Sequence, residues 1–186
     1  EKIRIIEGKS QLDEKLCLFA SFAKIIPEST LYYLNEIQKN GFSIIYISPT
    51  ELASSEIKKI ESLVAKIIIR EYHGRDFGSF KDALQYLEII NFSPEYLFLT
   101  KDTVFGPLHD LKPIFENFYQ AQEHWAGLVE NFSAVNYHIA SWFLLFKKEI
   151  IQENYFKDFW RQYKLKSSLR NAIINGELKL TSILIK

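Results

Sequence analysis

The sequence contains no methionine and only one cysteine, Cys17. A single cysteine cannot form an internal disulfide bond or a cysteine-rich zinc site. Cys17 lies in an apolar run, where we expect a small buried side chain. No signal peptide is recognisable, and no apolar run reaches the ~18 residues of a membrane-spanning helix. The sequence therefore predicts a cytoplasmic protein without a transmembrane segment, and the missing methionine indicates a segment excised from a longer protein.

The chain also has no excess of positive or negative charge, because 23 lysine and arginine residues balance 23 aspartate and glutamate residues. Such a chain has no overall field that would attract nucleic acid, so we expect no nucleic-acid partner. Hydrophobic residues make up 47% of the chain and aromatic residues 15%, which indicates a folded globular protein. Its length fits one domain, and we expect residues 1–186 to form it.

Apolar runs and helical patterns alternate along the first hundred residues. The apolar runs are dense and rich in β-branched residues, which is typical of parallel strands buried on both faces. These predicted strands span 15–21, 42–48, 65–71 and 95–100. The helices predicted between them span 27–41, 54–65 and 79–90, the last with Ser79 as its N-cap. This alternation predicts an α/β fold, a Rossmann-like sandwich around a mostly parallel sheet.

The second half of the chain adds further elements to this sheet. A helix is predicted over 110–122, followed by strands over 125–130 and 141–148. From Glu149 to about Gly176, the pattern predicts a helical C-terminal segment. Ligands of a parallel α/β sheet bind beyond the carboxyl ends of its strands. Polar residues that directly follow the predicted strands are therefore the candidates for a functional site.

The first candidate cluster is the stretch HGRDFGSFKDALQYL, which follows the third predicted strand. Gly78 would let the backbone approach a ligand closely, and the helix start would offer N–H groups to an anion. Arg75 and Lys81 add positive charge for a phosphate, and Asp76 can accept hydrogen bonds from a ribose or a base. The alternative is that Lys81 is a solvated surface charge and Gly78 only forms a turn. The glycine spacing matches neither a dinucleotide fingerprint nor a P-loop.

Two further clusters follow later strands. Asp102 comes directly after the fourth strand, beside Lys101, and a carboxylate there could hold a divalent cation against phosphates. An aspartate at such a place is otherwise a turn or capping residue. Glu130 ends the strand predicted over 125–130 and is a candidate general base. His138 follows it, although a lone histidine is more often structural than catalytic. Ser141 has no recognisable His or Asp partners, which disfavours a hydrolase.

Six segments also occur in the order and at the spacing of one known family: CLFASF, GRDFGSFKDAL, YLFLTKDTVFGPL, HWAGLVEN, HIASWFLLFKKEII and FKDFW. Together they resemble the rhamnan synthesis protein F family of polysaccharide-building glycosyltransferases, from Cys17 to near the end of the chain. The resemblance implies a GT-A-type fold and a role in cell-wall or O-antigen polysaccharide synthesis. It also implies a nucleoside-diphosphate sugar as donor, dTDP-β-L-rhamnose by analogy, and a saccharide or lipid-linked saccharide as acceptor.

The resemblance implies roles for individual donor-site residues as well. Arg75, Asp76 and Gly78 match the most distinctive motif of the family, at the place where GT-A folds hold the donor nucleotide. Asp102 matches the aspartate of a family NDS segment, near the metal-binding acidic motif of GT-A enzymes. Lys101 replaces the usual asparagine, so we expect it to compete with a divalent cation or to substitute for it. Mn²⁺ or Mg²⁺ is therefore expected to be held weakly at Asp102.

The reaction implied by the resemblance is an inverting displacement. Glu130 is the expected base, because it ends a strand on the acceptor side of such a fold, and His138 matches a family HxQSYF pattern. Such an enzyme would act in the cytoplasm or peripherally at the inner face of the plasma membrane. The alternative is a non-catalytic nucleotide-sugar or carbohydrate-binding module of a larger polysaccharide-assembly protein, since the segment around Asp102 departs from the family pattern.

Overall fold

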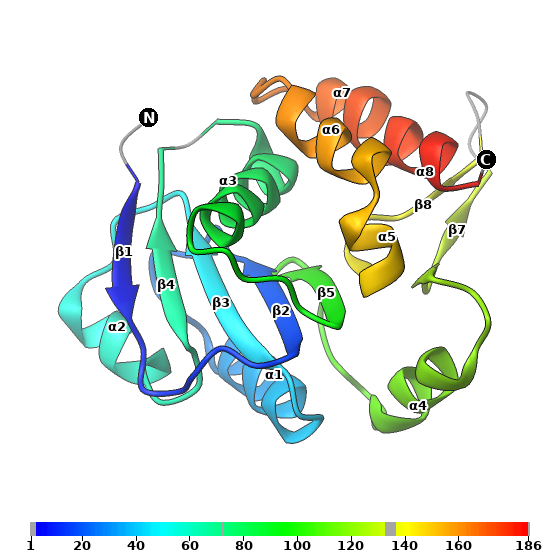
Figure 1. The fold of residues 1–186 in the computed structure, drawn as a ribbon. Helices are drawn as coiled ribbons and strands as arrows, with labels where there is room; N and C mark the ends of the chain where they lie inside the picture. Colours follow the sequence, from blue (N-terminus) through cyan, green and yellow to red (C-terminus); the bar gives the residue numbers. More distant parts are fainter. Residues whose placement is uncertain (1–2, 72, 133–136, 186) are drawn as a thin grey trace.

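The computed structural model describes residues 3–71, 73–132 and 137–185. Among these residues, seven strands form one sheet in the order β1-β4-β3-β2-β5-β9-β6 (Figure 1). The strands of this sheet are β1 (Arg4–Glu7), β2 (Lys15–Ala20), β3 (Ser43–Ser48), β4 (Lys66–Ile69), β5 (Tyr96–Lys101), β6 (Trp125–Gly127) and β9 (Phe143–Lys147). A separate antiparallel ribbon pairs β7 (Glu130–Asn131) with β8 (His138–Ile139).

The four strands predicted in the first hundred residues are parallel neighbours, in the order β4-β3-β2-β5. The predicted α/β class with a mostly parallel centre is thereby confirmed. The complete sheet is mixed, because β1 runs antiparallel to β4 and β9 runs antiparallel to β5. β1 has no counterpart in the sequence prediction, since its four residues are exposed at both ends and partly buried between. Such a short edge strand has no clear pattern in the sequence.

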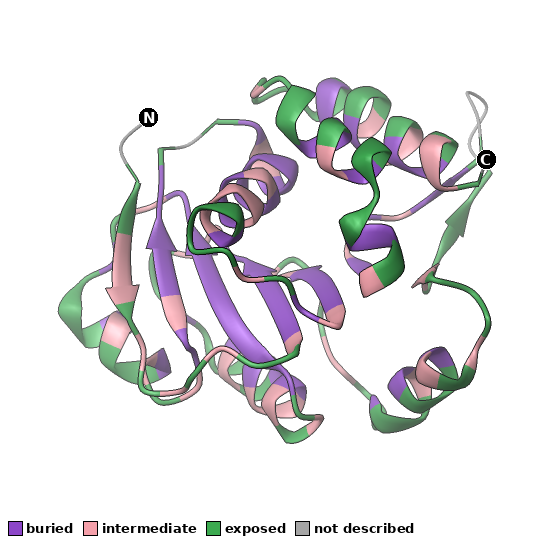
Figure 2. Ribbon diagram, in the orientation of Figure 1, coloured by how far each residue is buried: buried purple, intermediate pink, exposed green. Residues whose placement is uncertain are grey.

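Two hydrophobic cores cover the two faces of the sheet, because successive residues of a strand point to opposite faces. In β2, Leu16 and Leu18 belong to one core, whereas Cys17 and Phe19 belong to the other. The core of Leu16 is covered by α3 (Arg75–Ile89), α5 (Lys148–Gln152) and α6 (Asn154–Gln162). The core of Cys17 is covered by α1 (Glu28–Lys39), α2 (Ser54–Ile60) and α4 (Lys112–Gln120). Figure 2 shows that the central strands are buried almost throughout.

The predicted helical C-terminal segment is also confirmed. After α6 the chain forms α7 (Leu169–Asn171), the π-helix η1 (Ala172–Leu178) and α8 (Lys179–Leu184), which gather beside α6 in Figure 1. Trp160 of α6 is a core residue, with 3% of its surface exposed. In the described part of the chain, no helix is long and apolar enough to cross a membrane.

Two of the predicted boundaries that differ from the structure affect the site. The third helix begins at Arg75 rather than after Ser79, because Gly74 serves as its N-cap in a left-handed conformation with φ of 78°. Gly78 therefore lies inside α3 and not in a loop before it. The strand predicted over 125–130 ends at Gly127, and Glu130 begins the separate ribbon. Glu130 consequently does not extend a strand of the large sheet.

Candidate functional site

The order of the parallel strands places a crevice between β2 and β5. The chain proceeds from β2 outward to β3 and β4, and then returns to form β5 on the other side of β2. At such a reversal, ligands bind beyond the carboxyl ends of the two strands. A pocket of about 460 Å³ lies there, bordered by Phe22 after β2 and by Lys101 at the end of β5. We call it the switch-point pocket.

The polar lining of this pocket comes from segments that are far apart in the sequence. α3 contributes Arg75 and Asp76, β5 contributes Lys101, and η1 contributes Glu177. Ser141, which precedes β9, lies between them. Three of the residues predicted to bind a donor, namely Arg75, Asp76 and Lys101, are thus brought together.

A hydrogen-bonded network joins these side chains. Lys101 Nζ forms an ion pair with Asp76 Oδ2 at 2.5 Å. Ser141 Oγ lies 3.3 Å from the same Asp76 oxygen and 2.7 Å from Glu177 Oε1, and its backbone N–H donates to Glu177 Oε1 at 3.0 Å. Asp76 and Ser141 are buried, while the side chains of Lys101 and Glu177 are about one fifth exposed. Among the described lining residues, the two carboxylates therefore face one pocket with a single ammonium group and the shared hydroxyl of Ser141.

Arg75 is the second cation of the pocket. Its φ of 55° lies in the left-handed region, which costs an arginine roughly 1–3 kcal/mol. Among the described residues, no carboxylate forms an ion pair with its guanidinium group. The backbone strain and the unpaired charge both occur at the first residue of α3, where the helix dipole also favours an anion.

Gly78 and Lys81 do not line the pocket, although both were expected to bind a donor. A Cβ atom on Gly78 would lie 2.2 Å from the carbonyl oxygen of His73, so packing alone requires this glycine. Lys81 Nζ donates to the carbonyl oxygens of Arg161 and Tyr163, each at 2.8 Å. Lys81 therefore ties α3 to the C-terminal end of α6.

Asp102 is also not among the residues that line the pocket. Its Oδ2 atom accepts hydrogen bonds from Ser21 Oγ at 2.6 Å and from the backbone N–H of Phe22 at 2.8 Å. Asp102 thereby fastens the loop after β2 to the end of β5. Its Oδ1 atom is buried and has no hydrogen-bond partner among the described residues. The described residues contain no group of three or more His, Cys, Asp and Glu side chains that could hold a metal ion.

The two residues expected to be catalytic have different environments. Glu130 is exposed on β7, where Tyr137 Oη donates to its Oε1 atom at 3.3 Å, and it does not line the pocket. His138 is buried on β8, and its Nε2 atom lies 3.6 Å from Glu177 Oε2. His138 thus joins the network through Glu177, a residue that the sequence interpretation did not single out.

The C-terminal helices hold Glu177 in place. Asn171 Nδ2 donates to the hydroxyl oxygen of Tyr163 at 3.1 Å, and Asn171 Oδ1 accepts from Asn175 Nδ2 at 2.8 Å. Burial raises the pKa of Tyr163 to about 12, so this phenol stays neutral at physiological pH. The bonds join α7 and η1 to the segment after α6. No sequence motif marks Glu177, because its position depends on this packing.

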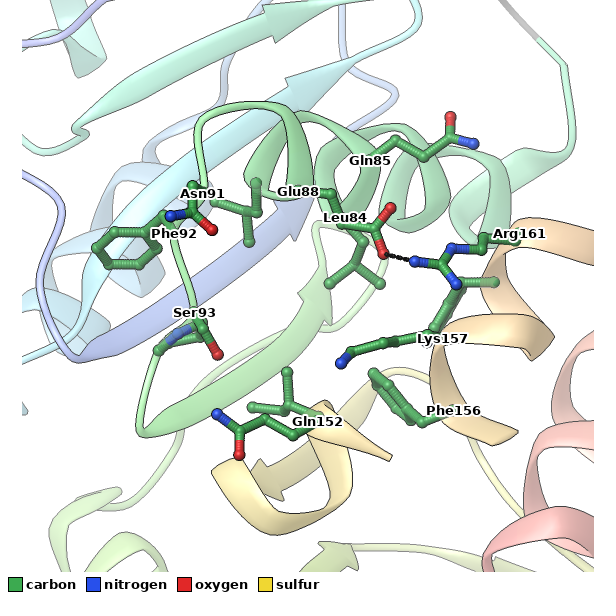
Figure 3. A pocket seen from close by; sticks show the side chains of 14 residues that line it. Leu84, Gln85, Glu88, Asn91, Phe92, Ser93, Gln152, Phe156, Lys157 and Arg161 are labelled. Atoms are coloured by element: carbon green, nitrogen blue, oxygen red, sulfur yellow. Dashed lines mark hydrogen bonds and ion pairs between the residues drawn. The ribbon is translucent and has the colours of Figure 1, made fainter. Parts of the chain in front are cut away.

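A second pocket, of about 330 Å³, lies at the other end of α3 (Figure 3). Its lining includes Leu84 and Phe156 as apolar residues and an ion pair of 3.1 Å between Arg161 and Glu88. Ser93, which also lines it, precedes β5, so this pocket lies at the amino end of the parallel strands. Ligands of open α/β sheets bind at the carboxyl ends. We therefore assign the candidate site to the switch-point pocket.

Comparisons with known proteins identify relatives of the chain. The model of the rhamnan synthesis protein F family matches residues 44–186, more than half of the chain. The uncharacterized protein y4gN of Sinorhizobium fredii is 23% identical over 181 residues, which cover 95% of this chain and 47% of that protein. The chain thus spans about half the length of this relative. No solved structure matches it significantly. The resemblance is confirmed over residues 44–186, which contain five of the six ordered segments, and the chain belongs to the rhamnan synthesis protein F family.

Proposed function

We propose that this domain binds a nucleoside-diphosphate sugar in the switch-point pocket and transfers the sugar to a saccharide acceptor during surface polysaccharide synthesis. The observation that carries the proposal is the meeting of Arg75, Lys101 and the first turn of α3 at the switch point. Two cations and a helix N-terminus suit a diphosphate. The family is named for rhamnan synthesis, which supports rhamnose as the sugar and dTDP-rhamnose as the donor.

The pocket is suited to such a donor in size and polarity. Its volume of about 460 Å³ lies within the range of small-ligand sites. Arg75 is unpaired among the described residues and can contact a phosphate directly, whereas Lys101 would exchange its contact with Asp76 for one with the diphosphate. Asp76 would then be able to accept a hydrogen bond from a ribose hydroxyl. The fold that we propose is of GT-A type, with the donor at the β2–β5 switch point.

The proposed reaction is a single displacement with inversion at the anomeric carbon. An acceptor hydroxyl oxygen forms the new bond while the bond from the anomeric carbon to the diphosphate oxygen breaks. The departing diphosphate carries away the bonding electron pair, and Lys101 and Arg75 stabilise its charge. Asp102 alone fits a divalent cation poorly, because its Oδ2 atom already accepts hydrogen bonds from Ser21 and Phe22 and its Oδ1 atom is buried. Any Mn²⁺ or Mg²⁺ would consequently be held weakly.

A second candidate function is a non-catalytic module that binds a nucleotide sugar or carbohydrate. One observation favours it: Lys101 is already neutralised by Asp76, so only Arg75 is immediately available to an anion. Such a module would bind ligand in the same pocket but would lack the charge balance needed for a departing diphosphate.

One experiment distinguishes the two functions. The protein is incubated with a panel of nucleoside-diphosphate sugars that includes dTDP-rhamnose, with and without oligosaccharide acceptors. Free nucleoside diphosphate and the melting temperature are both measured. A transferase releases nucleoside diphosphate, whereas a binding module shows a higher melting temperature and no release. A protein that shows neither response to any donor would refute the donor pocket.

A further inference from the structure

An inverting transfer requires a group that accepts the proton of the acceptor hydroxyl, and such a base typically contributes about 10²–10⁴ in rate. The group must reach the pocket, and exposed Glu130 does not line it. Among the described lining residues, the carboxylates are Asp76 and Glu177. Since this requirement arises from the proposed transfer, the inference below rests on the proposed function.

The surroundings of the two carboxylates distinguish them. Asp76 is paired with the ammonium group of Lys101 at 2.5 Å, and in the proposed donor complex it accepts a hydrogen bond from the ribose instead. Glu177 has no lysine or arginine partner among the described residues. Its Oε1 atom accepts both hydrogen bonds from Ser141, and its Oε2 atom lies 3.6 Å from His138 Nε2. Glu177 is therefore the lining carboxylate that neither the donor nor a cation of the described residues engages.

Backbone packing places Glu177 in the pocket with little freedom. A Cβ atom on the preceding residue, Gly176, would lie only 2.7 Å from a ring carbon of Phe77. Only glycine therefore allows η1 to approach α3 so closely. Phe77 is the neighbour of Asp76 in the sequence, and Gly176 is the neighbour of Glu177. The contact between Phe77 and Gly176 therefore places the two carboxylates on either side of Ser141. Glu177 also lies on a π-helical turn, a rare conformation that is frequent at functional sites.

We propose that Glu177 is the general base of the transfer and that His138 and Ser141 are its positioning residues. The acceptor oxygen attacks the anomeric carbon as its proton passes to a Glu177 carboxylate oxygen. The bond to the diphosphate breaks, and the electron pair leaves with the diphosphate beside Lys101 and Arg75. The step needs no further reactant, and proton release from Glu177 to solvent completes the cycle.

The test uses Glu177→Ala and Glu177→Gln, with Glu153→Gln as a matched control. Glu153 is an exposed carboxylate between α5 and α6 and lies outside the pocket lining. Both Glu177 variants should lose about 10²–10⁴ in kcat of transfer, while nucleoside-diphosphate affinity changes less than about threefold. Sodium formate should restore transfer at least about tenfold in Glu177→Ala, because a small carboxylate can occupy the space left by the side chain. Formate should not restore Glu177→Gln.

Three results would overturn the assignment. Transfer that falls less than about tenfold in both Glu177 variants shows that another group takes the proton. If transfer is lost in Glu130→Gln but kept in Glu177→Gln, the general base is Glu130, as expected from the sequence. Nucleoside-diphosphate affinity that falls in parallel with transfer makes Glu177 a binding or folding residue. If the wild-type protein binds donors but transfers nothing, the proposed transferase fails and this inference fails with it.

Discussion

Helix α3 carries two buried aspartates that form ion pairs, and the surroundings of the two pairs differ. Asp82 pairs with Arg70 of the segment after β4, and the two side chains are 3% and 2% exposed. Asp76 pairs with Lys101 of β5, and the two side chains are 8% and 20% exposed beside the switch-point pocket. One helix therefore carries an ion pair that is closed to solvent, at Asp82, and an ion pair that borders a pocket, at Asp76.

Access to solvent decides what each pair can do. Arg70 also donates to the carbonyl oxygen of His73 at 2.7 Å, and no pocket reaches this contact among those described. A ligand cannot replace Asp82 there, so the pair acts only on stability. Lys101 and Asp76 both line a pocket, so in the proposed function Lys101 exchanges Asp76 for a phosphate. The predictions below test this contrast, beginning with the largest expected effect.

Asp82→Asn should lower the free energy of unfolding by about 3–5 kcal/mol, because it leaves the buried charge of Arg70 without a counter-ion. The change is measured by urea denaturation. The control is Glu88→Gln, which removes an exposed ion pair with Arg161 on the same helix and should cost less than about 1 kcal/mol. Equal losses in the two variants would mean that the Arg70–Asp82 pair is not closed to water as described.

Asp76→Asn and Arg75→Ala should weaken nucleoside-diphosphate binding roughly ten- to a hundredfold, or ~1.5–3 kcal/mol for a lost charged hydrogen bond. Their stability should change far less than that of Asp82→Asn. Calorimetric titration and urea denaturation provide the two measurements. Unchanged affinity in both variants would show that the donor does not bind in this pocket. A loss of stability as large as that of Asp82→Asn would make Asp76 a structural residue like Asp82.

Lys81→Met should destabilise the protein by about 1 kcal/mol, since it removes hydrogen bonds to two carbonyl oxygens at the end of α6. Nucleoside-diphosphate affinity should remain within about twofold of the wild type. The two measurements separate the observed role of Lys81 from the donor-binding role expected from the sequence. A tenfold loss of affinity at unchanged stability would restore the expected role.

The sequence predicted those parts of the fold that depend on local pattern. The dense apolar runs around Cys17 and Ile45 became β2 and β3, because strands buried on both faces need apolar residues throughout. The start of α3 was missed because the left-handed Gly74 substitutes for a conventional polar N-cap. The division between β6 and β7 was missed because both segments are short.

The candidate site could be predicted only in part, for two physical reasons. Lys81 lies five residues after Asp76, a rotation of about 140° around a helix, so both cannot face one pocket once the helix starts at Arg75. Helix geometry would have excluded Lys81 if that start had been known. Glu177 enters the site through the contact of Gly176 with Phe77, and nothing in a single sequence indicates such a long-range contact.

The last prediction concerns the metal, whose removal should have a modest effect. Chelation of Mn²⁺ should reduce nucleoside-diphosphate affinity less than about tenfold, or ~1.4 kcal/mol. The reason is that the described lining already supplies Arg75 and Lys101, while Asp102 is engaged with Ser21 and Phe22. The measurement is calorimetric titration with Mn²⁺ and with a chelator. A larger loss would show that a metal is essential, and Asp102→Asn should then reproduce it.

Lys101→Asn sharpens the same experiment by removing the cation that pairs with Asp76 in the pocket. Asp76 and Glu177 would then face the pocket on either side of Ser141 without a neutralising ammonium group. Two carboxylates with substrate phosphates and water can complete the oxygen shell that Mg²⁺ or Mn²⁺ requires. We therefore expect this variant to bind Mn²⁺ more tightly and to lose more affinity for nucleoside diphosphate on chelation. If the variant binds Mn²⁺ no more tightly than the wild type, Lys101 does not substitute for a metal ion. The proposed exchange of Asp76 for a phosphate at Lys101 would then be unsupported.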